Sequence, residues 1–284
     1  MPLAGGNLGL NVWVENGDLL FLIASANNLN EHGMPVKLGL IRLHFDQDIF
    51  GHSFQQKLDL ERSEIVVSGD TASVRLWCEV LQPVIHVEVA AKEPVTLTAS
   101  YETWSNYEAK FVPDGLQWMR RLDPAMDRRA RDMAAQGMAE FAAAIPDPLR
   151  DLTTGGRLMA SGLVEAGMGV GSLNGLKTRT WSVKPSTPIM ELDLCFALRM
   201  EQDKSETDWE SELAALARRS VAKAHVEREE SLAWWKQFWE RSWIVINPGK
   251  DTADKAWQAG RNYQLFRYML AANRTGRSMT LFNG

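Results

Sequence analysis

Hydrophobic residues make up 45% and charged residues 24% of this 284-residue chain, which is typical of a globular protein of one large or two ordinary domains. The net charge is −5 at pH 7 and the lysines and arginines are scattered, which argues against a nucleic-acid partner. No apolar run approaches the roughly 20 residues of a membrane span, so no membrane partner is predicted either.

Residues 8–102 predict a succession of short β-strands. Apolar and polar side chains alternate along 8–15, 39–46, 74–79, 85–90 and 95–102, which is the period of a strand with one buried face. Asn16-Gly17 follows the first strand and is the strongest short hairpin signal, because both positions of a type I′ turn need positive φ. The pattern predicts a mainly β fold, with antiparallel strands in a sandwich or barrel.

The apolar phase of these strands predicts six core positions. Truncating one of the leucines among them to alanine is expected to lower the free energy of unfolding by roughly 2–5 kcal/mol. The six positions are Leu10, Val12, Leu43, Leu76, Val87 and Leu97.

Residues 123–144 interrupt the strands with an apolar stripe at helical spacing, so they predict a helical excursion on the surface of the sandwich. Strands are expected to resume at 156–165, 178–183 and 189–200. Three glycines lie between the first two of these strands and predict a loop or a tight hairpin, because no strand-to-helix context supports a dinucleotide-binding fingerprint. They are Gly167, Gly169 and Gly171.

From Thr207 the pattern becomes helical. The segment Thr207-Asp208-Trp209-Glu210 predicts a capping box at the start of a helix. Trp209, Leu213, Leu216 and Ala224 then share one face, and residues 243–246 predict a short strand after the helix.

Four of the eleven tryptophans fall within ten positions, at Trp234, Trp235, Trp239 and Trp243. Exposed indole faces bind sugar rings, whereas buried ones anchor junctions between elements. Positions 235 and 239 share a helical face. We therefore expect Trp235, Trp239 and Trp243 to pack at the joint between the helical connector and the sandwich.

Residues 252–273 predict one further amphipathic helix, with its apolar stripe at Trp257, Leu265, Phe266, Met269 and Ala272. A single helix cannot bury its own stripe. We therefore expect the chain to be the N-terminal part of a larger protein. We also expect the exposed stripe to make the isolated chain prone to self-association.

Motifs for metal, cofactor or nucleophile chemistry are absent from the sequence, so neither a metal nor a cofactor is predicted. His44 and His86 lie on polar phases of strands, where a structural role is expected. Cys78 and Cys195 predict two buried thiols, with a single disulfide as the alternative. Glu191 and Asp193 share a strand face and predict an exposed acidic surface.

Residues 1–19, MPLAGGNLGLNVWVENGDL, resemble the opening of large bacterial proteins that pair an N-terminal β-sandwich with an (α/α)6 barrel. They are similar to the α-L-fucosidase-like glycoside hydrolases of family 95 and to a bacterial family that carries a domain-of-unknown-function label. Residues 264–284 look like the first barrel helix and the loop after it. The other stretches that carry the likeness are residues 37–39, 82–88, 147–156 and 235–244.

The chain departs from the family pattern at three places: Ala4-Gly5-Gly6, residues 25–30 and residues 119–122. These departures argue against a contribution of the sandwich to a substrate site. In the resembling hydrolases the catalytic acid and its partners lie in the barrel, so no catalytic residue is carried over. The only substrate contacts the resemblance implies are Asn283 and Phe282, in the loop after the first barrel helix.

The resemblance implies a large, supersandwich-like β-sandwich over 1–203, a helical connector over 204–250 and the start of an (α/α)6 barrel over 251–284. It also implies that the chain is the non-catalytic N-terminal part of a carbohydrate-active enzyme, inactive by itself. Its partners would be carbohydrate, bound by the full-length protein, and the missing C-terminal barrel.

Two alternatives stay open: a sugar-binding module, and a purely structural or assembly domain. The resemblance favours a periplasmic or secreted protein, although no basic region followed by an apolar stretch marks a signal peptide at the N-terminus.

Overall fold

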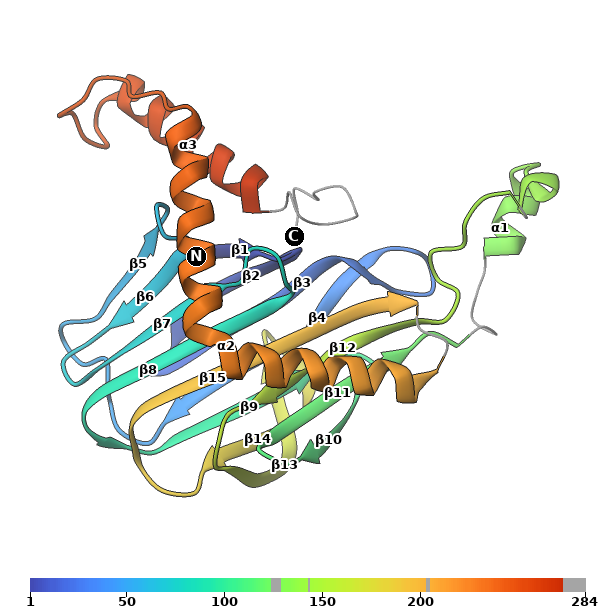
Figure 1. The fold of residues 1–284 in the computed structure, drawn as a ribbon, viewed down its shortest axis with the longest axis horizontal. Helices are drawn as coiled ribbons and strands as arrows, with labels where there is room; N and C mark the ends of the chain where they lie inside the picture. The colour runs from blue at the N-terminus through green and yellow to red at the C-terminus, as the bar shows by residue number, and fades with distance from the viewer. Residues whose placement is uncertain (124–128, 143, 203–204, 273–284) are drawn as a thin grey trace.

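Two antiparallel β-sheets lie face to face, and helix α2 (Glu206–Arg241) covers the outer face of one of them (Figure 1). The computed structural model describes residues 1–123, 129–142, 144–202 and 205–272. The expected mainly β sandwich is thus confirmed. None of the helices in this part of the chain is long and apolar enough to cross a membrane.

The seven-stranded sheet, here called sheet A, holds both the N-terminal strands and a late hairpin. Its spatial order is β1-β2-β3-β4-β9-β14-β13. The strands are β1 (Pro2–Gly5), β2 (Leu8–Glu15), β3 (Asp18–Leu29), β4 (Pro35–Phe45), β9 (Leu97–Thr103), β14 (Leu176–Pro185) and β13 (Leu163–Leu173).

The eight-stranded sheet, here called sheet B, has the order β10-β11-β12-β15-β8-β7-β6-β5. Its strands are β10 (Glu108–Val112), β11 (Gly115–Arg121), β12 (Leu152–Met159), β15 (Ile189–Gln202), β8 (Val84–Val95), β7 (Ala72–Cys78), β6 (Glu64–Ser68) and β5 (Gln55–Asp59).

The first hairpin forms as predicted. Asn16 and Gly17 have φ of 53° and 84°, and Glu15 pairs with Asp18 across the turn. Both turn residues are in the left-handed region, which asparagine and glycine tolerate best.

The core lies between the inner faces of the two sheets. All six predicted core residues belong to it, and their exposed fractions lie between 0% and 4%. The alternation of apolar side chains is therefore a correct guide to which face of each strand is buried.

Leu76 offers a direct test of this core. We expect Leu76→Ala to lower the free energy of unfolding by roughly 2–5 kcal/mol, because it removes buried methyl groups and leaves a cavity. Leu176, which is 55% exposed at the start of β14, is the matched control, and its alanine variant should change stability by less than about 0.5 kcal/mol. Urea unfolding followed by circular dichroism compares the two.

The predicted strand over 156–165 is two strands rather than one, and the hairpin is the correct alternative for the three glycines, which lie in its first strand. A turn at 160–162 separates β12 from β13, and the glycines lie within β13. A Cβ atom on Gly171 would stand 2.7 Å from Thr178 Oγ1, and Gly167 follows a bulge with φ of 116°. Gly171 thus allows the edge strand to approach the side chains of β14 closely, whereas a Cβ atom on Gly167 or Gly169 would meet no atom within 4 Å.

The helix in the excursion after β11 ends earlier than predicted, at Ala135. The excursion contains α1 (Arg129–Ala135) and the 3-10 helix η2 (Ala139–Phe141), while positions 124–128 and 143 of the predicted helix lie outside the described residues. Neither α1 nor η2 has a buried residue, and Figure 1 shows α1 projecting away from the sheets. Because this segment packs on no core, burial of its apolar stripe does not stabilise a longer helix.

The N-cap of helix α2 lies two residues before the predicted cap, Thr207. Ser205 is the N-cap, and its Oγ accepts a hydrogen bond from Asp208 N at 3.1 Å and donates one to Asp208 Oδ2 at 2.7 Å. The Ser-x-x-Asp spacing therefore caps the helix in place of the predicted Thr207-x-x-Glu210 box.

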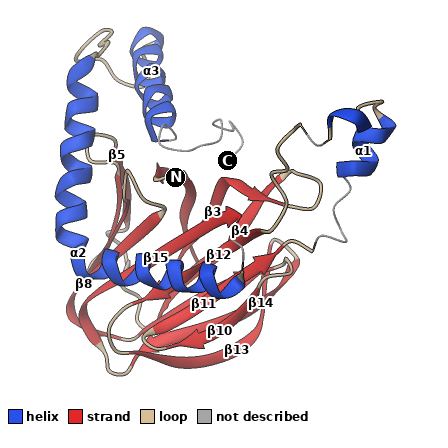
Figure 2. Cartoon of the chain, turned by 45° about the vertical axis from the view of Figure 1, so that its right-hand side comes forward, coloured by secondary structure: helices blue, strands red, loops and turns tan. Residues whose placement is uncertain are grey.

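The first half of α2 packs on the outer face of sheet B. Trp209, Leu213 and Ala217 are buried there against Val84 and Cys195, among others. Midway the helix changes direction, and its second half leads away from the sheet face toward α3 (Lys255–Ala272), as Figures 1 and 2 both show.

The second half of α2 and the end of α3 meet in a separate cluster, here called the aromatic joint. Trp235 is 1% exposed and its ring lies 5.2 Å from that of Tyr268, while Trp239 Nε1 donates to Leu60 O at 2.8 Å. The expected packing is thus confirmed for two of the three tryptophans. It is wrong for Trp243, which is 70% exposed.

The predicted strand over 243–246 is also wrong, because α3 takes the place that a partner strand would need. Gln264 Nε2 donates to Ile244 O at 2.9 Å, and Ile246 lies against Gly260. The segment therefore runs along a helix and pairs with no strand in the part of the chain that the structure describes.

Helix α3 starts at Lys255, after Asp254, whose Oδ1 accepts a hydrogen bond from Trp257 N at 2.7 Å. Its buried side holds Tyr268 and Ala272, and Phe266 and Met269 are 45% and 38% exposed. The predicted stripe is thus correct at Ala272, with Trp257 and Leu265 half-buried, and wrong at Phe266 and Met269, because the joint buries Tyr268.

Candidate functional site

The two predicted substrate contacts, Asn283 and Phe282, lie outside the described residues. The two histidines considered in the sequence have structural surroundings. His86 is 4% exposed, its Nε2 lies 2.9 Å from Glu79 Oε1, and its ring stacks on Trp77 at 4.0 Å. His44 is half-exposed on β4.

Two of the stretches that carry the family resemblance meet at one end of the sandwich. Gly6 and Asn7, with φ of 55° and 68°, form the turn between β1 and β2. Gly6 N donates to Val80 O at 3.2 Å, and a Cβ atom on Gly6 would stand 1.7 Å from Gln82 O. Only glycine fits here, so the turn and loop 79–83 are locked together.

A tyrosine ties this end of the sandwich to α3. Tyr268 OH accepts a hydrogen bond from Ala4 N at 3.3 Å and lies 3.1 Å from Ser63 Oγ. Burial raises the pKa of Tyr268 well above its ordinary range, so the hydroxyl stays protonated. The N-terminal strand, sheet B and α3 are therefore joined at one buried point.

Beside this turn lies a hollow of about 390 Å³, between the ends of β3 and β15 and the first half of α2. Its charged side chains comprise two acids and two arginines, so it carries no net charge. Such a lining can form hydrogen bonds with a polyol or with another stretch of polypeptide. The polar side chains are Asn7, Asn27, Gln82, Arg199, Glu201, Glu212 and Arg219.

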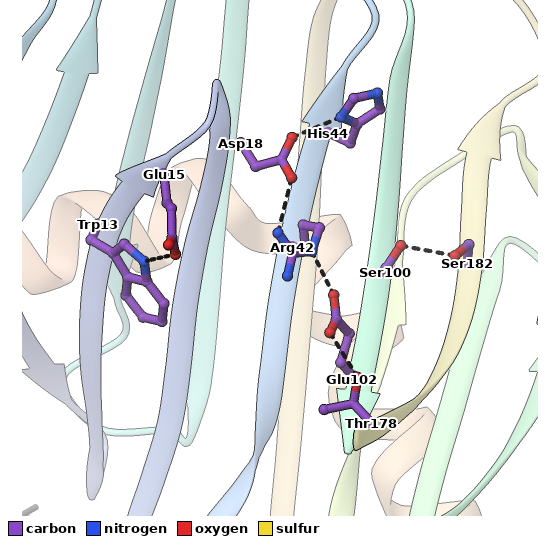
Figure 3. A network of polar contacts seen from close by, with 9 residues as sticks. All are labelled: Trp13, Glu15, Asp18, Arg42, His44, Ser100, Glu102, Thr178 and Ser182. Atoms are coloured by element: carbon purple, nitrogen blue, oxygen red, sulfur yellow. Dashed lines mark hydrogen bonds and ion pairs between the residues drawn. The ribbon is translucent and has the colours of Figure 1, made fainter. Parts of the chain in front are cut away.

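A polar network that draws several strands together lies on the outer face of sheet A (Figure 3). Arg42 Nε donates to Glu102 Oε1 at 2.6 Å, and its Nη1 donates to Asp18 Oδ2 at 2.9 Å. Thr178 Oγ1 donates to Glu102 Oε2 at 3.1 Å, and His44 Nδ1 lies 2.7 Å from Asp18 Oδ1. Four strands thus contribute to one network.

Arg42 keeps its charge in this network. Burial of the guanidinium opposes the charge, but the hydrogen bonds and charges of Glu102 and Asp18 outweigh it and raise the pKa of Arg42. A glycoside hydrolase needs two carboxyl groups that face each other across the scissile bond. Here both carboxylates are bound to the same arginine, so the network fits a structural role rather than catalysis.

The two cysteines are free and buried, which confirms the predicted thiols. Burial, with the charge of Glu79 as a second cause, raises the pKa of Cys195 to about 12, and the same two causes raise the pKa of Cys78. A thiol reacts as its thiolate, so neither is reactive in the folded protein.

We therefore expect a chromogenic disulfide reagent at pH 8 to label neither cysteine in the native chain and both in urea. The same shift predicts that stability falls as pH rises. Above about pH 9 the unfolded thiols lose protons that the folded thiols keep, up to about pH 12 for Cys195. Rapid labelling of Cys195 in the native chain would contradict this account.

A solved structure shares the fold at low sequence identity. An inverting mannosidase of family GH92 from Bacteroides thetaiotaomicron matches with a TM-score of 0.50 and 12% identity, over 86% of this chain and 34% of that one. A protein assigned as a kojibiose phosphorylase, from the human microbiome, matches with a TM-score of 0.45 and 10% identity, over 95% and 38%. The chain thus spans little more than a third of either protein.

The sequence comparisons give the family. No curated protein sequence matches the chain. The model of the N-terminal domain of a family described as "Domain of unknown function (DUF5703)" matches residues 1–122 and 110–244, which is most of the chain. The chain therefore belongs to the DUF5703 family.

Proposed function

We propose that this chain is the non-catalytic N-terminal sandwich module of a carbohydrate-active enzyme, a glycoside hydrolase in the broad sense. The observation that carries the proposal is the fold match to the GH92 mannosidase, which covers 86% of this chain but only 34% of that protein. In that protein most of the polypeptide lies outside the matched sandwich. By analogy, the catalytic carboxylates would lie in a helical barrel downstream of residue 284.

The polar network on sheet A supports the non-catalytic part of this proposal. Glu102 is 2% exposed, and both Glu102 and Asp18 are bound to Arg42. A general acid must instead reach the oxygen of the leaving group within hydrogen-bonding distance. This carboxylate pair is therefore unsuited to the reaction.

Helix α3 supports the expected continuation into a barrel. Phe266 and Leu270 are 45% and 44% exposed, and at 3.6 residues per turn they lie on the side of α3 opposite Tyr268. A helix with apolar residues on both sides is typical of one that packs between neighbours. The division into 1–203, 204–250 and 251–284, the likeness to family 95 and the sugar contacts of Asn283 and Phe282 remain parts of this proposal.

An activity assay tests the proposal. We expect the purified chain to show no turnover of aryl glycosides, with α-L-fucosides and α-mannosides in the panel. Turnover that co-purifies with the chain through two columns and is lost in Asp18→Asn or Glu102→Gln would contradict the proposal and would place a catalytic site in the sandwich.

A further inference from the structure

An exposed tryptophan lies at the end of strand β9, outside every cluster described above. Trp104 is 37% exposed and lines a hollow of about 350 Å³, here called the Trp104 hollow. Within residues 1–123, 129–142, 144–202 and 205–272, no ring packs against Trp104 and no acceptor pairs with its indole N–H. Two tryptophans with structural roles, Trp118 and Trp181, are 0% and 6% exposed.

The strand register places this hollow at the same end of sheet A as the glycine turn between β1 and β2. Gly9 pairs with Ala24, Leu40 pairs with Glu102, and Thr103 pairs with Arg179. Because these pairings are antiparallel, the end of β9 and the start of β2 lie at the same end of sheet A. Loops at one end of a rigid sandwich are a common place for binding residues.

The walls of the hollow are held rigidly. Arg179 Nη1 donates to Glu108 Oε1 at 3.0 Å, and its Nη2 donates to Tyr107 O at 2.6 Å. Tyr107 is fully buried, and its hydroxyl donates to Asn28 Oδ1 at 2.8 Å. The segment that carries Trp104 is therefore fixed before any ligand arrives, which lowers the entropy lost on binding.

Two polar side chains at the hollow have no partner in the described part of the chain. Asn106 and Lys177 are both exposed and both line it. They offer an amide, which can donate and accept, and an ammonium group, which can only donate. Since Glu108 and Arg179 neutralise each other, Lys177 leaves the hollow with a net positive charge.

We propose that the Trp104 hollow binds a pyranose ring of a glycan. The apolar face of the sugar would pack on the indole, and its hydroxyls would meet Asn106 and Lys177. The volume is that of a pocket for a small ligand. The unpaired ammonium favours a sugar that carries a carboxylate, such as a uronic acid.

This inference stands apart from the proposed function. A module that binds sugar can belong to an inactive domain or to an enzyme, and the absence of hydrolysis does not decide whether the hollow is occupied. Its test is therefore a binding measurement rather than an activity assay.

The test uses the whole 284-residue chain and saturation-transfer difference NMR with methyl glycosides of mannose, fucose, glucose, galactose and galacturonic acid. We expect saturable binding, tightest for the galacturonide. Trp104→Ala should weaken it at least tenfold, and Asn106→Ala, which removes no packing, should weaken it several-fold. Lys177→Met should remove the preference for the galacturonide over the galactoside.

Trp243→Ala is the matched control, because Trp243 is 70% exposed and lies outside the hollow; binding should be unchanged. Circular dichroism checks that each variant is folded. The proposal is overturned if no glycoside binds, if Trp104→Ala and Asn106→Ala leave binding unchanged, or if Trp243→Ala abolishes it. Self-association that Trp104→Ala removes, without sugar binding, would assign the hollow to contacts between chains and would also overturn the proposal.

Discussion

Replacing Trp235 by alanine should lower the free energy of unfolding by roughly 3–5 kcal/mol. Its indole is 1% exposed and lies 5.2 Å from the ring of Tyr268, 6.3 Å from that of Trp239 and 5.6 Å from that of Phe238. Alanine would leave a cavity where α2, α3 and the loop at Val80 converge. The joint holds α3 to the sandwich, so this cavity should also loosen α3.

Trp243→Ala is the control, because it removes a tryptophan that does not pack in the aromatic joint. Trp243 comes from the same run of tryptophans but is 70% exposed, so its alanine variant should stay within about 0.5 kcal/mol of the parent. Urea unfolding followed by circular dichroism avoids the loss of fluorescence that either substitution causes. Equal effects of the two variants would show that the joint does not stabilise the chain.

Gly6→Ala should lower the free energy of unfolding by about 3 kcal/mol. Part of this loss, about 1–2 kcal/mol, comes from placing alanine at a φ of 55°. A further 1–3 kcal/mol comes from steric overlap, because the new Cβ would stand 1.7 Å from Gln82 O and 2.9 Å from Glu79 O. Both oxygens belong to the backbone, so neither can move without shifting loop 79–83.

Gly9→Ala is the control on the neighbouring strand. No atom lies within 4 Å of a Cβ built on Gly9, and its φ is not positive. Alanine there should be neutral or should stabilise by up to about 1 kcal/mol, because glycine loses more backbone entropy on folding. Thermal unfolding of both variants makes the comparison. A stable Gly6→Ala chain would contradict the tight contact between the turn and the loop.

The sandwich could be predicted because its signals are local. Alternation along β2, β4, β7, β8 and β9 identifies the buried face of each strand without knowledge of its neighbours, and Asn16-Gly17 determines the first hairpin by backbone conformation alone. Helix α2 could be predicted for the same reason, since Trp209 and Leu213 recur at helical spacing.

The errors arise where distant residues decide the local structure. Gly167, Gly169 and Gly171 do not distinguish a loop from a hairpin in sequence, and the pairing with β14 makes them part of an edge strand. The segment from Trp243 to Ile246 has strand composition, yet α3 lies alongside it. Propensity is a weak guide in both places because tertiary contacts override it.

The polar sites could not be predicted from spacing. Asp18, Arg42, Glu102 and Thr178 come from four strands, and only the pairing order β3-β4-β9-β14 brings them together. For the Trp104 hollow one signal can be read from the sequence, a tryptophan directly after an alternating strand. Asn106 follows it by two residues, but Lys177 meets it only through the pairing of β9 with β14.

The most direct measurement compares this chain with the polypeptide encoded by the whole reading frame that contains it, on the same panel of aryl glycosides. Our account predicts turnover by the longer polypeptide and none by residues 1–284. It also predicts that turnover is lost when downstream acidic residues are changed to amides and is kept in Asp18→Asn. Turnover by residues 1–284 alone, or a longer polypeptide that hydrolyses no glycoside, would contradict it.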